Sequence, residues 1–206
     1  SWKTKISMSE TREFFRTTRC RARAYAVRGD ESFLMCHWGD RNVVKYMEEC
    51  FIGSISEAEA EIADCASRLE QDNGLTNYVV ESLETSEPIG TCGAWLIASS
   101  VGGDKLHQRW QSQDGAVKEI EVGYDLAVDK WGQGLGTELL KGLMSVLRVP
   151  GQPWQGLPIV AFVDAENVGS QRVLEKGGFI LEGERQYHVG NSKFEPALRF
   201  KLGGVS

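Results

Sequence analysis

The chain has 206 residues, of which 41% are hydrophobic and 25% are charged, and its formal net charge is −6. This length and composition predict a single domain over residues 1–206 with one hydrophobic core. The acidic balance and the scattered lysines and arginines argue against a nucleic-acid partner. The sequence has no apolar stretch near the ~20 residues of a membrane span, which argues against a membrane partner.

The first third of the chain predicts an edge strand followed by helices. Residues 17–25 alternate polar and small side chains, as an edge strand does. Residues 30–36 and 41–47 predict two short helical pieces. A Ser-x-x-Glu capping box at Ser56 predicts a helix from there to about Gln71, and an Asn-Gly pair then ends that helix.

A predicted β-hairpin comes next in the chain. Residues 77–81 and 89–97 are largely apolar runs joined through a Ser-Glu-Pro turn, which predicts two antiparallel strands. Residues 99–115 are longer than a usual hairpin connection, so we expect this segment to be either mobile or functional, with Trp110 as its large apolar anchor.

Three glycines lie where a predicted strand turns into a predicted helix. Residues 119–128 alternate in polarity and predict the strand, while residues 137–147 carry leucines at helical spacing. Gly132, Gly134 and Gly136 leave a turn without side chains, in which unpaired backbone N–H groups at the helix start can point at a phosphate. We predict an anion-binding turn, and a glycine-rich turn without a ligand is the alternative.

The spacing of these glycines disfavours two common nucleotide sites. A phosphate-binding loop has a lysine directly before its Ser or Thr, and Thr137 follows a glycine instead. A dinucleotide fingerprint has the spacing Gly-x-Gly-x-x-Gly, whereas this turn has Gly-x-Gly-x-Gly and lies late in the chain. A nucleotide-binding enzyme is therefore a weaker alternative.

A second motif follows about thirty residues later. Residues 158–163 predict a buried strand, and Asn167, Ser170 and Arg172 begin a predicted helix that ends at a pair of glycines before Phe179. Asn167 is a candidate ligand residue and equally a candidate N-cap. The chain then ends in a predicted hairpin, with strands over residues 179–189 and 193–202.

The two motifs together resemble the GNAT N-acetyltransferase superfamily. Gly123-Tyr-x-Leu followed by Trp131-Gly-x-Gly-x-Gly-Thr-Glu138 is similar to its ribosomal-protein N-terminal acetyltransferases, the RimJ/RimL-like branch. The second motif resembles Asn-x-x-Ser-x-x-Val-x-x-Lys-x-Gly-Phe of the same family, and residues 17–25 resemble the Thr-x-Arg-Leu-x-Leu-Arg opening of that branch. The resemblance covers residues 17 to about 202.

This resemblance implies a fold and a co-substrate. The fold is α/β of the mixed α+β kind, with a central, mostly antiparallel mixed sheet of about seven strands, flanked by helices and splayed at the cofactor site. The co-substrate is acetyl-coenzyme A, used without a metal. The expected cofactor site comprises Leu126, Ala127, Val128, Trp131, Gly132, Gln133, Gly134, Leu135, Gly136, Thr137, Asn167, Ser170 and Arg172.

The implied reaction is direct transfer of an acetyl group to a primary amine. Backbone amides around residues 126–128 are expected to hold the acetyl carbonyl. A general base must accept the proton of the amine, and Glu121 is the first candidate, with Glu119 behind it on the same strand face. The alternative is that both glutamates line a solvated face or bind a basic neighbour. Ser170, or else Tyr187, is expected to protonate the leaving thiolate.

The acceptor is expected to be a protein N-terminus, an amino acid or a small amine. Trp38, Tyr46 and His188 are predicted to line its site, although each is also a candidate packing residue. The rival function is a non-catalytic acyl-coenzyme A sensor, which the presence of Glu121, Ser170 and the full glycine turn disfavours.

The cysteines and histidines predict neither metal nor disulfides. Five cysteines, an odd number without a Cys-x-x-Cys pair, argue against a zinc site and a disulfide framework, and the three histidines have no metal-ligand spacing. A reducing compartment is therefore expected, which predicts a cytoplasmic protein. The protein is expected to be a monomer or a homodimer.

Overall fold

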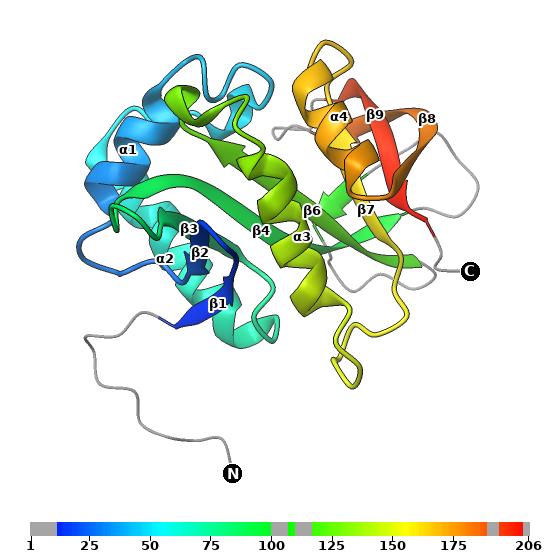
Figure 1. Ribbon diagram of the computed structural model, residues 1–206, viewed down its shortest axis with the longest axis horizontal. Helices are drawn as coiled ribbons and strands as arrows, with labels where there is room; N and C mark the ends of the chain where they lie inside the picture. The colour runs from blue at the N-terminus through cyan, green and yellow to red at the C-terminus, as the bar shows by residue number, and fades with distance from the viewer. Residues whose placement is uncertain (1–11, 100–106, 110–116, 189–193, 204–206) are drawn as a thin grey trace.

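The computed structural model describes residues 12–99, 107–109, 117–188 and 194–203 (Figure 1). Its strands are β1 (Glu13–Arg16), β2 (Cys20–Arg23), β3 (Asn77–Ser82), β4 (Pro88–Ser99), β5 (His107–Arg109), β6 (Val117–Leu126), β7 (Ile159–Val163), β8 (Phe179–His188) and β9 (Phe194–Leu202). Its α-helices are α1 (Glu31–Gly39), α2 (Ile55–Gln71), α3 (Leu135–Leu147) and α4 (Val168–Lys176), and two 3₁₀ segments are η1 (Glu48–Cys50) and η2 (Val128–Lys130).

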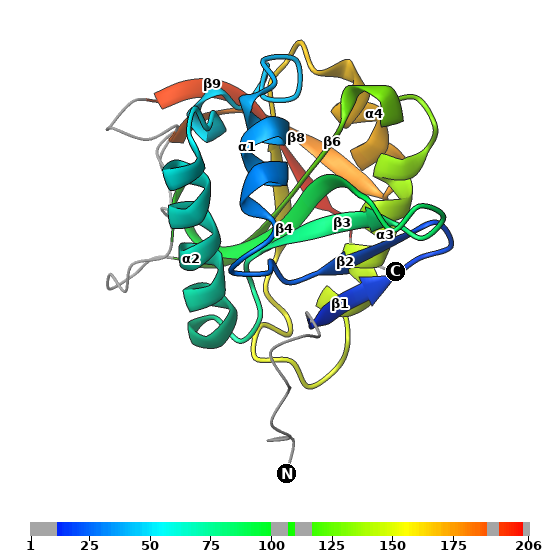
Figure 2. The same ribbon diagram turned by 90° about the vertical axis from the view of Figure 1, so that its left-hand side faces the viewer.

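All the described strands form one sheet, in the order β1-β2-β3-β4-β6-β7-β9-β8, with β5 also paired to β4. Every neighbouring pair is antiparallel except β6 and β7, which run parallel. Helices α1 and α2 lie on one face of the sheet and α3 on the other (Figure 2). The predicted mixed, mostly antiparallel architecture is confirmed.

The predicted number of about seven strands is too low, because the described residues contain nine. The two additional strands are β1, which lies outside the predicted strand at residues 17–25, and the three-residue β5 inside the predicted connection at 99–115. β1 makes the sheet edge, so β2 is an inner strand. Trp110 and most of that connection lie outside the described residues.

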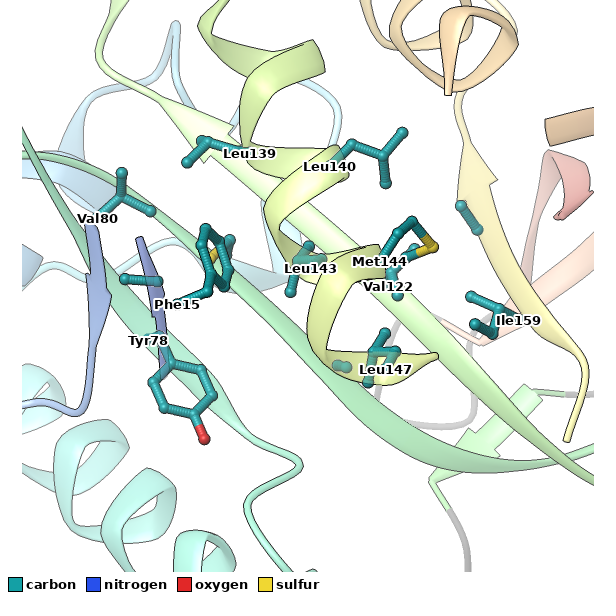
Figure 3. Packing of buried hydrophobic residues seen from close by; sticks show 14 of the residues in the cluster. Phe15, Tyr78, Val80, Val122, Leu139, Leu140, Leu143, Met144, Leu147 and Ile159 are labelled. Carbon is teal, nitrogen blue, oxygen red and sulfur yellow. The ribbon is translucent and has the colours of Figure 1, made fainter. Parts of the chain in front are cut away.

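Two apolar clusters hold the layers together. On one face, the leucines of α3 pack against Val122, Ile159 and Phe15 of the sheet (Figure 3). On the other face, α1 and α2 bury a smaller cluster that contains Leu34 and Ile62. Apolar side chains therefore cover β3, β4 and β6 on the α3 face. On the other face the smaller cluster reaches the sheet at Val79 of β3, and β6 carries the buried Glu119 and Glu121 there.

Two predicted helix details are wrong for local reasons. Residues 41–47 form turns rather than a helix, closed by single bonds such as Met47 N–H to the Val44 oxygen (2.9 Å), and two adjacent β-branched valines disfavour helix there. The cap of α2 is Ser54 rather than Ser56. Its hydroxyl accepts the Glu57 N–H (3.3 Å), which is an equally good Ser-x-x-Glu pattern two residues earlier.

We expect the same Gly-to-Ala change to have opposite effects in two helices. A Cβ at Gly142 in α3 would lie 2.3 Å from the Phe15 ring, whereas at Gly169 in α4 the nearest atom is 3.6 Å away. Gly142→Ala should therefore destabilise the fold by about 1–3 kcal/mol through overpacking. Gly169→Ala should stabilise it by up to about 1 kcal/mol through helix propensity. Denaturant unfolding measures both, and a stabilised Gly142→Ala variant would contradict this packing.

Candidate functional site

The sheet opens between β6 and β7. β4 pairs with β6 along its whole length, from Gly90–Leu126 to Ser99–Val117. β7 pairs with β6 at two positions only, Ile120–Ile159 and Glu121–Val160. Beyond them the two parallel strands are not paired, so the carboxyl-terminal half of β6 has an unpaired edge toward β7, which we call the gap. This is the splay that the resemblance implies.

Strand geometry decides which backbone groups of β6 face this gap. Successive residues of a strand direct their N–H and C=O groups to opposite sides. The Ala127 N–H donates to the Ile89 oxygen on the β4 side (2.9 Å), and the Ile120 N–H donates to the Pro158 oxygen on the β7 side (2.8 Å). Tyr124 and Leu126 therefore direct their backbone groups toward the gap. Of the amides expected to hold an acetyl carbonyl, that of Leu126 is placed for this and that of Ala127 is already bonded to β4.

The glycine turn, residues 132–136, lies directly after β6 and η2. Gly132 and Gly134 have φ angles of +71° and +78°, a left-handed conformation that favours glycine. The N–H of Glu138 makes the first helical bond of α3, to the Gly134 oxygen (3.2 Å). The N–H groups of the three residues between them have no partner within the helix, as at any helix start. The turn, exposed at residues 132–134, thus presents unpaired N–H groups of the kind that can bind an anion.

Trp131 and Gly136 fix this turn to the body of the protein. The Trp131 indole N–H donates to the Leu126 oxygen (2.7 Å), which ties the beginning of the turn to the end of β6. A Cβ at Gly136 would lie 3.3 Å from Val173 of α4 and 3.8 Å from the Tyr124 ring. Close packing of α3 on α4 is therefore sufficient to explain the glycine at 136.

The second motif, at the start of α4, lies against Tyr124 of β6. The Asn167 side-chain oxygen accepts the Ser170 N–H (3.1 Å), so the N-cap role of Asn167 is confirmed. The Ser170 hydroxyl lies 3.0 Å from the Tyr124 hydroxyl. Burial raises the pKa of Tyr124 to about 12, so its phenol is protonated at neutral pH. Tyr124 was not predicted as a site residue, although it belongs to the Gly-Tyr-x-Leu motif.

The two predicted carboxylates differ in their partners. Glu119 and Glu121 are only 4% and 5% exposed, so a solvated face is excluded. Glu119 binds a basic residue, accepting from the Arg199 guanidinium of β9 (2.8 Å). Glu121 accepts the indole N–H of Trp95, its cross-strand neighbour on β4 (3.0 Å). The Trp95 ring occupies the space beside Gly123, where a Cβ would lie 2.8 Å from it.

A third carboxylate on the same face was not predicted as a site residue. Asp125 accepts from the Thr91 hydroxyl (2.6 Å) and the Trp38 indole N–H (3.4 Å), and it contacts the His37 imidazole. His37 and Trp38 belong to α1, so this cluster holds α1 against the end of β6. Trp38 is 5% exposed and packs in the smaller core cluster. Its packing role is thus established, whereas contact with an acceptor stays a prediction.

The remaining predicted residues lie around the rim. The Tyr46 hydroxyl donates to the Glu166 oxygen (3.4 Å), which connects the segment after α1 to the loop before α4. Arg172 is exposed on α4. Tyr187 and His188 pair through their backbones with Glu195 and Phe194 in the last hairpin, while their side chains lie outside the described residues.

Within the described ranges, no group of three or more His, Cys, Asp or Glu residues could hold a metal ion. In the same ranges, no helix is both long and apolar enough to cross a membrane.

Comparison with known proteins agrees with this geometry. The chain is 27% identical over 175 residues to an uncharacterised N-acetyltransferase of Bacillus licheniformis, covering 84% of this chain and 86% of the relative. A solved structure of RimL, a ribosomal-protein alpha-N acetyltransferase, in complex with coenzyme A has a TM-score of 0.66 at 16% identity, covering 90% of this chain and 94% of that chain. An aminoglycoside-bound structure, AAC(6′)-Ib with ribostamycin and coenzyme A, has a TM-score of 0.63 at 21% identity, covering 89% and 92%. The acetyltransferase (GNAT) domain family matches residues 19–180, and the chain therefore belongs to that family.

Proposed function

We propose that the protein transfers the acetyl group of acetyl-coenzyme A to a primary amine, with Glu121 as the general base. The observation that carries this proposal is the early end of the β6–β7 ladder, because the glycine turn follows β6 in the chain and the second motif follows β7. Acetyl-coenzyme A supplies a thioester, whose carbonyl carbon an amine can attack. The backbone N–H of Leu126 faces the gap and is suited to stabilise negative charge on the carbonyl oxygen.

The acidic face of β6 supports the assignment of the base. Of the two predicted glutamates, Glu119 is engaged by Arg199, and Glu121 accepts the indole N–H of Trp95. An indole N–H orients a carboxylate without neutralising its charge, so this hydrogen bond leaves Glu121 able to accept a proton. Since Glu121 is buried, we propose that the proton reaches it through a water molecule.

Tyr124 and Ser170, on the other face of β6, are proposed as the general acid that protonates the thiolate of coenzyme A. Tyr124 and Ser170 share a hydrogen bond at 3.0 Å, and the raised pKa of Tyr124 means that its phenol carries a proton at neutral pH. We propose that this pair protonates the departing thiolate, with Ser170 as the group nearest the sulfur and Tyr124 as its proton source. Tyr187 stays the alternative donor.

The acceptor is proposed to be a protein N-terminus, an amino acid or a small amine that enters on the face of β6 carrying Glu121 and Asp125. The RimJ/RimL-like motif and the similarity to RimL favour a protein N-terminus, whereas the similarity to AAC(6′)-Ib favours a small amine. The five cysteines are free thiols, which supports a cytoplasmic location.

Ligand-induced thermal stabilisation tests this function against its rivals. A ligand that binds the folded state raises the melting temperature, by an amount that grows with its concentration over its Kd. We expect acetyl-coenzyme A to raise it and ATP and NAD to leave it unchanged. An amine panel with detection of free thiol then tests turnover. A shift with ATP or NAD alone would favour a nucleotide-binding enzyme, and a shift with acetyl-coenzyme A without thiol release from any amine would favour the sensor.

A further inference from the structure

We propose that Arg19 and Glu138 form a clamp that positions the glycine turn for an anionic ligand and neutralises the carboxylate nearest to it. The inference rests on the proposed function in one respect, namely that the ligand of the turn is the pyrophosphate of coenzyme A. Neither residue is among the predicted site residues, although both belong to motifs of the sequence, the opening at residues 17–25 and the Gly-Thr-Glu end of the turn.

One arginine side chain reaches both the carboxylate and the turn. The Arg19 backbone N–H donates to one Glu138 carboxylate oxygen (2.7 Å), and its Nε donates to the other (2.7 Å). Its Nη1 donates to the carbonyl oxygen of Gln133 (3.0 Å). Arg19 directly precedes β2, so these three bonds join the first part of the chain to the turn.

The bond to the Gln133 carbonyl orients the turn. In a trans peptide the C=O and the following N–H point in opposite directions. Because Arg19 holds the Gln133 oxygen against the protein, the N–H of Gly134 points away from Arg19, toward the exposed side of the turn. The left-handed φ of Gly134 (+78°) belongs to the same arrangement. Arg19 therefore favours the orientation in which the turn presents a donor to a phosphate.

The negative charge of Glu138 is the reason that a cation is required beside the glycine turn. Its carboxylate belongs to the first turn of α3, close to the N–H groups that would bind a phosphate. Burial raises the pKa of Glu138, but hydrogen bonds from Thr17 and from the amide and guanidinium of Arg19 outweigh burial and lower the pKa below its usual value. The carboxylate is thus charged at neutral pH. Without a cation beside it, it would repel a phosphate group.

The two charges differ in exposure in a way that suits this role. The Arg19 side chain is 47% exposed and that of Glu138 only 18%. The guanidinium is therefore the more solvent-exposed partner of the pair and screens the carboxylate from an anion that approaches from solvent. Exposed ion pairs contribute little to folding stability, so a substantial effect of Arg19 is expected on ligand binding rather than on unfolding.

Calorimetric titration with coenzyme A tests the clamp in four variants and a control. Arg19→Ala is expected to raise the Kd at least about tenfold, since a charge-assisted contact is lost and a like charge is left unpaired. Glu138→Gln keeps Arg19 and removes the carboxylate, so its affinity should hold or rise. The double variant should recover about threefold or more of the loss in Arg19→Ala, because the unpaired carboxylate is gone.

One further variant separates charge from geometry, and a control variant tests whether the effect is specific to Arg19. Arg19→Lys keeps the positive charge but loses the fork that reaches Gln133, so its Kd should lie between those of wild type and Arg19→Ala. The control is Arg16→Ala, which breaks an equally short ion pair with Glu13 (2.7 Å) on the edge strand β1 and should leave the Kd unchanged. Melting temperatures without ligand verify folding in each variant.

The outcomes separate the clamp from the proposed function. Wild-type affinity in Arg19→Ala, or a double variant that binds no better than Arg19→Ala alone, would overturn the clamp while coenzyme A binding itself stands. A wild-type protein that binds no coenzyme A would overturn the proposed function and the clamp with it. The salt dependence of the Kd gives a second readout, since it should be weaker in Arg19→Ala than in wild type.

Discussion

Glu121→Gln is expected to lower kcat by about 10²- to 10⁴-fold, the usual contribution of a general base. Glutamine has the same shape and still offers an oxygen to the Trp95 indole, so the fold and the Kd for acetyl-coenzyme A should change little. The amine loses its proton acceptor, so the deficit should shrink at high pH, where more of the amine is already neutral. Thiol release measured against pH, at saturating acetyl-coenzyme A, gives the result.

Glu119→Gln is the matched control for this prediction, because it is the same change two residues away on the same face of β6. It weakens the ion pair with Arg199, so we expect lower stability with turnover largely kept. The opposite result, an active Glu121→Gln and an inactive but folded Glu119→Gln, would move the base to Glu119. Full activity in both variants would show that neither carboxylate is the base. The amine would then lose its proton to a chain of water molecules, or would bind already neutral.

Gly134→Val is expected to weaken coenzyme A binding at least about 100-fold, a loss of roughly 3 kcal/mol. A β-branched residue is strained at a φ of +78°, at a cost of about 1–3 kcal/mol, so the turn must rearrange. Its side chain would also project from the exposed turn, where the phosphate must approach the backbone. Titration calorimetry on the folded variant measures the loss.

A second valine variant controls for backbone strain. Gly151, in the loop at the other end of α3, has a φ of +84° and no atom within 4 Å of an added Cβ, so it matches Gly134 in conformation, whereas an added Cβ at Gly134 would lie 3.8 Å from the Arg19 guanidinium. Gly151→Val should cost similar stability and leave coenzyme A affinity intact. Gly136→Val, which presses on Val173 at 3.3 Å, should also lose affinity. Unchanged affinity in folded Gly134→Val and Gly136→Val would refute the glycine turn as the anion site.

The parts of the fold that are encoded locally could be predicted from the sequence. The alternation along residues 119–128 predicted β6, and Asn167 at the start of the predicted second-motif helix predicted the cap of α4. β5 could not be found in this way, since three residues carry no periodicity and become a strand only through pairing with β4. The Ser-x-x-Glu pattern occurs twice near residue 55, and the pattern alone does not choose between Ser54 and Ser56.

The site was predictable where motifs are local and was missed where partners come from distant segments. The glycine turn and the pair of glutamates follow from short patterns. Arg199 beside Glu119, Trp95 beside Glu121 and the α1 residues around Asp125 depend on the order of strands and on the placement of α1, which periodicity does not report. The packing of Trp38 could not be told in advance from an acceptor contact, because an aromatic residue on a short helix serves a core and a binding site equally well.

The early end of the β6–β7 ladder gives one strand two kinds of backbone amide. The N–H of Ala127, and by strand alternation those of Asp125 and Gly123, are bonded to β4, while those of Tyr124 and Leu126 face the gap. In the free protein, protection against hydrogen exchange should thus alternate residue by residue along the end of β6, although this strand lies in the interior of the sheet, where exchange is usually slowest. A ligand in the gap would convert that alternation into uniform protection.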